Sequence, residues 1–246
     1  MVRVGRTLVT GSYDGALIWW DVDSRKQIRR IAAHDRWIRQ VIASPNSSHI
    51  ISVADDMQCK VWNAATGESV AAFSDHQPMT PHHFPSMLYV VAASPDGQLL
   101  ATGDRVGHVA IRDAKTFEKV SELETPVMYT WDPTARRHSI GGIRSLAFSP
   151  NSAQLAVGGI GKIGNIDHLQ GPARLEVFDV ATCNRILELE DNNKKGLIEQ
   201  IVWSPDQSWI LTAGGDNDGF LTIYNAESGE LIHQDGKSGH IHGLAH

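Results

Sequence analysis

The chain has 246 residues, of which 41% are hydrophobic, and it carries a formal charge of −6 at pH 7. This length suits either one large all-β domain or two small domains. Because broad affinity for nucleic acid or anionic membranes needs clustered positive charge, the acidic balance excludes it, and we expect no nucleic-acid and no membrane partner.

The first residues hold no apolar stretch of signal-peptide length, and no run of about 18 apolar residues occurs further on. We therefore expect a soluble protein that is cytoplasmic by default. Its two cysteines, Cys59 and Cys183, are too few for a disulfide framework and lack the spacing of a metal site.

A repeated turn organises the chain. Ser-Pro followed by Asn or Asp begins at residues 44, 94, 149 and 204. An alternating apolar segment precedes each copy, and a second one follows it after a short polar turn. A third strand, ending in a bulky residue and Asp or Asn, and a fourth short strand complete the unit. Four short strands per repeat predict an all-β fold, a β-propeller of four-stranded antiparallel blades with about five blades' worth of sequence.

These repeats resemble the WD-repeat (β-transducin-like) propeller family, in divergent form, over essentially the whole chain. The second blade has the full signature of that family, with His34, Ser52, Asp56 and Trp62. The resemblance implies that these side chains form a hydrogen-bonded network, which ties the loop before the blade to its third strand. Such a buried network is stabilising when every donor has a partner.

The other blades depart from the signature. The first lacks the His, and the third has Val106 and Arg112 where Asp and Trp are expected. In the fourth, Phe178 replaces Trp. The equivalent positions in the first and last blades are Thr10, Asp14 and Trp20, and Thr212, Asp218 and Tyr224.

We expect a single propeller domain over residues 1–246. Its complete blades are predicted at residues 35–73, 87–123, 143–189 and 197–234. Residues 7–34 supply only the last three strands of a first blade, and residues 240–246 supply one additional first strand. Either this strand closes a five-bladed ring, which would place His240 beside Thr10, Asp14 and Trp20, or the chain is part of a longer propeller. We favour the second alternative because propellers of this family most often have seven blades.

The long connections share one expected face. In this family the loops between the second and third strands, and those between blades, lie on the same face. The long segments 74–86, 124–142 and 160–172 are all of these kinds. Because long insertions on a regular scaffold usually hold the function, we expect a binding surface here. Its candidate residues are Tyr129, Trp131, Arg136, Arg137, His138, Arg144, Lys162 and Asn165. Alternatively, Tyr129 or Trp131 only pins a long loop onto the blade beneath it.

One of these insertions contains a motif typical of nucleotide sites. Gly159, Gly161 and Gly164 form G-x-G-x-x-G directly after an apolar strand. That fingerprint places the phosphate at the N-terminus of a following helix, but Gly171 and Pro172 leave no room for one. We therefore interpret the glycines as the start of a loop between two strands.

Histidines are the remaining candidates for chemistry. His76, His82 and His83 lie in one Pro-rich loop, and His240 and His242 form an H-x-H pair. No neighbouring Cys, Asp or Glu completes a coordination set, so we predict no metal site, no catalytic residue and no cofactor.

The leading hypothesis is a non-catalytic protein–protein interaction scaffold that binds protein partners or other domains of a longer chain. An enzyme, or a small-ligand or metal binder that uses the channel mouth and the His-rich loop, is one alternative. The other is a truncated piece of a larger WD-repeat protein without an independent function.

Overall fold

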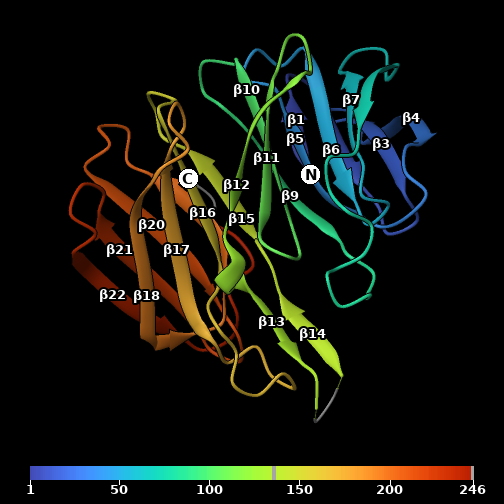
Figure 1. The fold of residues 1–246 in the computed structure, drawn as a ribbon. Helices are drawn as coiled ribbons and strands as arrows, with labels where there is room; N and C mark the ends of the chain where they lie inside the picture. Colours follow the sequence, from blue (N-terminus) through green and yellow to red (C-terminus); the bar gives the residue numbers. More distant parts are fainter. Residues whose placement is uncertain (135–136, 245–246) are drawn as a thin grey trace.

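The computed structural model describes residues 1–134 and 137–244. In these residues, five antiparallel sheets of four strands follow one another along the chain, and a two-stranded hairpin lies between the third and fourth sheets (Figure 1). The all-β class and the four-stranded antiparallel blades expected from the repeat are therefore confirmed.

Every blade has the strand order of the sequence, from an inner first strand to an outer fourth strand. Blade one consists of β1 (Val2–Val4), β2 (Thr7–Gly11), β3 (Ala16–Asp21) and β4 (Lys26–Ala32), and blade two of β5 (Ile38–Ala43), β6 (His49–Ala54), β7 (Cys59–Asn63) and β8 (Ser69–Phe73). Blade three consists of β9 (Leu88–Ala93), β10 (Leu99–Asp104), β11 (His108–Asp113) and β12 (Lys119–Glu124). Blade four consists of β15 (Ser145–Phe148), β16 (Gln154–Ile160), β17 (Pro172–Asp179) and β18 (Arg185–Lys195), and blade five of β19 (Leu197–Trp203), β20 (Trp209–Gly215), β21 (Gly219–Asn225) and β22 (Leu231–Lys237).

The two ends of the chain differ from the expectation. Blade one has a first strand after all, because the short β1 pairs antiparallel with β2. Residues 240–244 form no strand, so the additional first strand expected at 240–246 is wrong for its described part. Instead, Ile241 N donates to Gly214 O at 3.4 Å, and Gln200 hydrogen-bonds to Leu244, which ties this segment to blade five.

The segment 124–142 also holds more structure than a loop. It contains a 3-10 turn, η1 (Pro126–Met128), and the hairpin of β13 (Tyr129–Asp132) and β14 (His138–Gly141). In the described part of the chain, no helix has the length and apolarity needed to cross a membrane.

The turn after Ser-Pro explains the regularity of the first two strands of each blade. Its fourth residue has a left-handed backbone in all four copies, with φ of 58° at Ser47, 72° at Gly97 and 62° at both Ser152 and Gln207. Glycine adopts this conformation without a steric penalty, whereas the other residues are held there by the turn. Register thus comes from the local turn as well as from apolar alternation.

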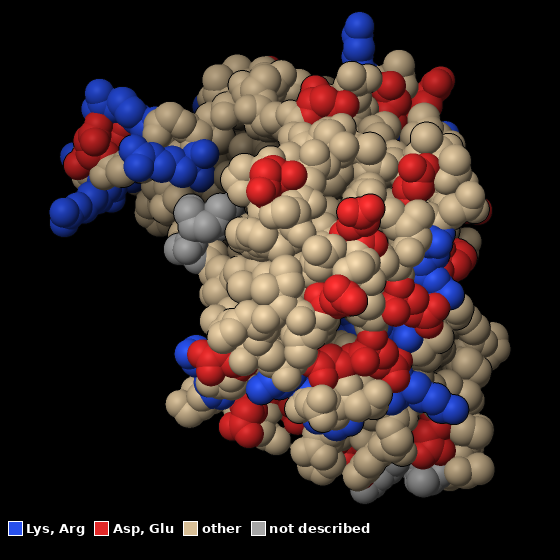
Figure 2. Space-filling view, turned by 90° about the vertical axis from the view of Figure 1, so that its left-hand side faces the viewer, with Lys and Arg blue, Asp and Glu red and all other residues tan. Residues whose placement is uncertain are grey.

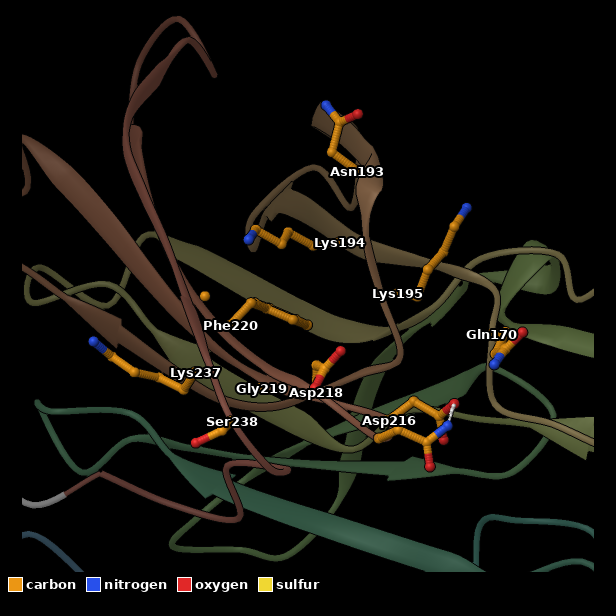
Figure 3. A pocket seen from close by; sticks show the side chains of 12 residues that line it. Gln170, Asn193, Lys194, Lys195, Asp216, Asp218, Gly219, Phe220, Lys237 and Ser238 are labelled. Atoms are coloured by element: carbon orange, nitrogen blue, oxygen red, sulfur yellow. Dashed lines mark hydrogen bonds between the residues drawn. The ribbon is translucent and has the colours of Figure 1, made fainter.

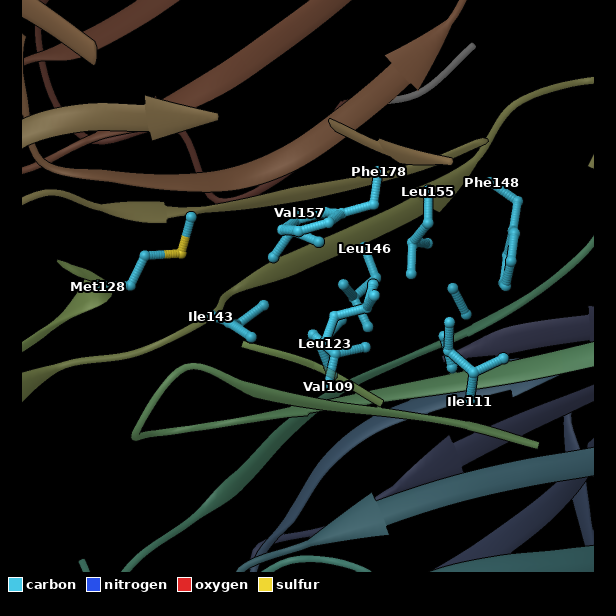
Figure 4. Packing of buried hydrophobic residues seen from close by; sticks show 13 residues of the cluster. Val109, Ile111, Leu123, Met128, Ile143, Leu146, Phe148, Leu155, Val157 and Phe178 are labelled. Atoms are coloured by element: carbon cyan, nitrogen blue, oxygen red, sulfur yellow. The ribbon is translucent and has the colours of Figure 1, made fainter. Parts of the chain in front are cut away.

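The core lies between the blades. Each of four apolar clusters joins neighbouring blades, and the cluster between blades three and four is the largest (Figure 4). Successive inner strands are in contact, β1 with β5, β5 with β9, β9 with β15 and β15 with β19. The blades therefore follow one another in space as in sequence, from blade one at the right of Figure 1 to blade five at the left.

Candidate interaction face

Blade two contains the complete signature network. His34 Nδ1 lies 3.0 Å from Asp56 Oδ2, and His34 Nε2 lies 2.8 Å from Ser52 Oγ. Trp62 Nε1 donates to the same hydroxyl at 2.9 Å. Burial alone would raise the pKa of Asp56, but hydrogen bonds from His34 and from two backbone amides outweigh it and lower the pKa. This network fixes the loop before β5.

Blade three has an equivalent network in which Asp104 replaces the Asp that the repeat spacing predicts at position 106. His76 Nε2 lies 2.8 Å from Thr102 Oγ1, and His76 Nδ1 lies 3.0 Å from Asp104 Oδ2. The backbone amides of Val106 and His108 donate to the other carboxylate oxygen, at 2.9 and 3.0 Å. Asp104 stands two positions before the expected Asp, at the end of β10, so the third blade is tied down despite Val106.

Arg112, at the Trp position of blade three, is held by the carboxylate of Asp75, which precedes His76 in the loop 74–86. Arg112 Nε donates to Asp75 Oδ2 at 2.6 Å, and its guanidinium lies 4.4 Å from the centre of the Phe73 ring. The loop that begins at residue 74 is therefore fixed at its start by both Asp75 and His76.

The remaining blades have no full signature network among the described residues. In blade one, Trp20 Nε1 donates to Thr10 Oγ1 at 3.0 Å, and Asp14 pairs with Arg30. In blade five, burial raises the pKa of Tyr224, and the Asp218 carboxylate has no partner in the described chain. His240 lies beside Glu199 and Asp216 of blade five, away from blade one.

Blade four replaces the signature by a buried ion network. Arg174 Nε donates to Glu176 Oε1 at 2.7 Å, and Arg185 Nη1 donates to Glu176 Oε2 at 2.9 Å. Both Arg174 and Glu176 are at most 3% exposed. A buried charge is tolerated only when it is paired, which is the case for both groups.

Ring contacts join two of the three long insertions. The His82 ring lies 4.5 Å from Trp131 and 5.7 Å from Tyr129, nearly parallel to both, and His82 Nδ1 lies 3.0 Å from Tyr129 Oη. Phe84 packs against Trp131 at 5.2 Å and against His138 at 6.0 Å. The two aromatic side chains of β13 thus hold the His-rich loop 74–86 and join two of the insertions.

The third insertion joins the same surface from the other side. Ile163 N donates to Thr130 Oγ1 at 3.0 Å, which fixes the segment after β16 against β13. Ile163 and Ile166 are buried, whereas Lys162 and Asn165 are exposed. No helix follows Gly164 in this fully described segment, and a Cβ at Gly159 would lie 2.7 Å from the Gly142 carbonyl. Gly159 therefore allows the backbones of two insertions to pack closely, whereas a Cβ at Gly164 would meet nothing within 4 Å.

A groove lies where these segments meet. It measures about 290 Å³, and its lining residues are Pro126, Val127, Tyr129, Thr130, Trp131 and Lys162. Five of them come from η1 and β13, and Lys162 comes from the insertion in blade four. The groove thus combines apolar and aromatic walls with a single amine.

The other candidate residues do not all lie at this groove. Arg137 and His138 are exposed on the hairpin, and Asn165 shapes its own turn by accepting from Asp167 N at 3.1 Å. Arg144 lies over the Tyr89 ring, 3.5 Å from its centre, beside the inner strands. Arg136 falls outside the described residues.

A second hollow, of about 630 Å³, lies beside the end of the blade-four insertion (Figure 3). It is bordered by Gln170 of that insertion, by the end of β18, and by the turn between β20 and β21. Its charged residues are Lys194, Lys195, Lys237, Asp216 and Asp218. Sequence reasoning missed it because residues 192–194 bulge out of β18, whose pairing jumps from Asp191 to Lys195.

An exposed aromatic pair is a second feature that the sequence did not indicate. Tyr13 is 71% exposed and lies 4.3 Å from the ring of Trp37, which is 38% exposed. Arg39 lies on Trp37 at 3.8 Å and is clamped by two hydrogen bonds of 2.7 Å to Asp55. Large aromatic rings held in place are typical of interaction hot spots. The sequence did not indicate this pair because Tyr13 and Trp37 are far apart in the chain and belong to different repeats.

The described residues contain no group of three or more His, Cys, Asp or Glu side chains arranged to hold a metal ion. His76 belongs to the blade-three network, His82 lies against the aromatic rings, and His240 stacks on His242 at 4.3 Å. Figure 2 shows the side of the molecule on which blade five lies; Asp and Glu side chains are spread over its middle, and Lys and Arg gather on the projection at the upper left and in the lower part.

Comparison with known proteins agrees with the blade networks. The family model described as "WD domain, G-beta repeat" matches residues 25–63 and 183–225. Each match starts at an outer strand, β4 or β18, and ends with the third strand of the next blade.

Several curated proteins are similar to most of the chain. Eukaryotic translation initiation factor 3 subunit I of Lodderomyces elongisporus is 28% identical over 87% of this chain and 54% of its own length. The same subunit of Pyricularia oryzae is 24% identical over 82% of this chain and 52% of its length. The WD repeat-containing protein VIP3 of Arabidopsis thaliana is 26% identical over 84% of this chain and 58% of its own length. The chain therefore spans about half the length of the curated relatives it matches. The resemblance of the chain to the WD-repeat family is confirmed, and residues 25–63 and 183–225 are the segments that match the family model.

Proposed function

We propose that the chain is a non-catalytic protein–protein interaction scaffold that presents the insertions 74–86, 124–142 and 160–172 to a protein partner. The observation that carries this proposal is the contact between them, His82 with Tyr129 and Ile163 with Thr130. These contacts unite three segments that are distant in sequence into one surface. A surface supported by rigid blades can bind without paying the entropy of ordering its loops.

The similar proteins support the same class of function. One relative is by name a subunit of a translation initiation factor, and a subunit is a component of an assembly. We infer that this chain likewise acts by holding other proteins. The partner is then recognised by the insertions, because the blades themselves are regular.

Lys162 and Arg137 are the residues to test this face. Both are exposed, whereas Tyr129 and Trp131 support the loop 74–86, so that their removal would disturb the fold as well. We expect the double variant Lys162→Ala/Arg137→Ala to retain the thermal unfolding temperature of the parent chain. It should lose most of the proteins that cross-link to the parent in an extract of its source cells, measured by mass spectrometry.

The matched control removes two positive charges elsewhere. Lys26 and Lys115 are exposed on an outer strand and on the turn between β11 and β12, and the variant Lys26→Ala/Lys115→Ala should keep the cross-linked proteins. Equal losses in both variants, or cross-links that avoid all three insertions, would overturn the proposed function.

A further inference from the structure

The groove between η1, β13 and Lys162 is preformed. Tyr129 and Trp131 form part of its wall, and the His82 ring stacks on both of them. Thr130 between them is 8% exposed and accepts a hydrogen bond from the backbone of the blade-four insertion. Because walls of this kind need little reordering on binding, the groove offers affinity at low entropic cost.

The volume of the groove limits what it can hold. At about 290 Å³ it lies at the lower end of the range for small-molecule sites, which is roughly 300 to 1,000 Å³. Its lining includes Val127, which is 37% exposed, and the ring of Pro126. A single side chain of a peptide therefore suits it better than a whole cofactor.

The charge of the groove indicates that its ligand carries a negative charge. Lys162 is exposed, and its amine has no ion-pair or hydrogen-bond partner among the described residues. Among the described residues, no Asp or Glu lines the groove, in contrast to the second hollow, where Asp216 and Asp218 lie among the lysines. An unpaired amine beside apolar walls is complementary to a carboxylate that flanks an apolar side chain.

We propose that this groove binds an acidic peptide segment of a protein partner. One aliphatic or aromatic side chain of the segment lies between Val127 and Trp131, and a neighbouring carboxylate binds the Lys162 amine. The inference rests on the proposed function and deepens it, because it states the chemistry that the interaction face recognises.

The experiment selects ligands from a display library of random 12-residue peptides on the purified chain. We expect the selected peptides to carry Asp or Glu within about two residues of Leu, Ile, Met or Phe. One selected peptide, labelled with a fluorophore, then serves as the probe in anisotropy titrations. Lys162→Glu should weaken its binding by more than about tenfold, the effect of losing one charge-assisted hydrogen bond and adding repulsion, while Lys162→Arg should stay within about threefold of the parent.

Lys195→Glu is the matched control for general charge attraction. Lys195 is exposed at the end of β18, where it lines the second hollow and not the groove, and its substitution changes the net charge equally. It should leave the affinity within about threefold of the parent. A selection that yields basic peptides or no peptides, or an equal effect of Lys195→Glu and Lys162→Glu, would overturn the inference.

Failure of this inference and failure of the proposed function give different results. If proteins still cross-link through the insertions but no acidic peptide is selected, the face binds by other chemistry. If acidic peptides bind at Lys162 but no cellular protein depends on Lys162 and Arg137, the proposed function fails while the groove chemistry stands.

Discussion

The carboxylate of Asp104 accepts the hydrogen bonds that the family signature assigns to an Asp two positions further along the turn. It is 1% exposed and has partners on both oxygens, His76 on one side and two backbone amides on the other. We expect Asp104→Ala to lower the free energy of unfolding by about 3 kcal/mol, because it leaves buried donors without an acceptor. Urea unfolding measures this change.

The exposed Asp35 provides the comparison for that substitution. Its side chain makes no hydrogen bond among the described residues, so Asp35→Ala should change the free energy of unfolding by no more than about 0.5 kcal/mol. Equal costs at the two positions would show that the blade-three network adds nothing to stability.

At the scale of the element, the Ser-Pro turn couples stability to pH. In blade five, Ser204, Ser208 and the Ser208 amide hydrogen-bond to Asp206 and lower its pKa to about 2, from an ordinary value of 3.8. Because the pKa of Asp206 is lower in the folded chain than in the unfolded chain, the carboxylate stabilises the folded state fully at pH values above the unfolded pKa. This contribution disappears as the pH falls through about 2, the folded pKa. In blade two, Asn46 accepts the same three bonds without a charge.

Asp206→Asn should therefore keep the turn but lose its acid sensitivity. Between pH 5 and 7 we expect the variant to be slightly less stable than the parent in urea unfolding. The difference should shrink steadily from about pH 4 towards pH 2, where the parent carboxylate becomes protonated. The reverse change, Asn46→Asp, should introduce such a pH dependence into blade two. A difference that stays constant over this range would contradict the assigned cause.

Elements that arise from local pattern were predictable, and those that depend on distant partners were not. The Ser-Pro turns and the alternating strands follow from neighbouring residues, which is why the blades and the His34 network could be recognised. Asp104 comes close to His76 only in the folded chain, and the hairpin of β13 and β14 is held by His82 of the insertion 74–86. The bulge in β18, and with it the second hollow, likewise depends on pairing with Pro172, which no local pattern encodes.

At the scale of the whole molecule, the blades form a row in which each contacts its neighbours in sequence. Ile51 and Val61 of blade two are 1% exposed because blade three covers them, whereas Leu211 and Ile223, at the same register in blade five, are partly exposed. Stability in such arrays is approximately a sum over units and their interfaces, so a blade covered on one side opens more easily.

We expect backbone amides in β2 and β20 to exchange with deuterium at least about tenfold faster than those in β6, β10 and β16, a difference of about 1.4 kcal/mol in opening free energy. All five strands are the second of their blades and are paired on both sides, so sheet position does not bias the comparison. Uniform protection, measured by native-state hydrogen exchange, would show instead that the five blades unfold as one cooperative unit.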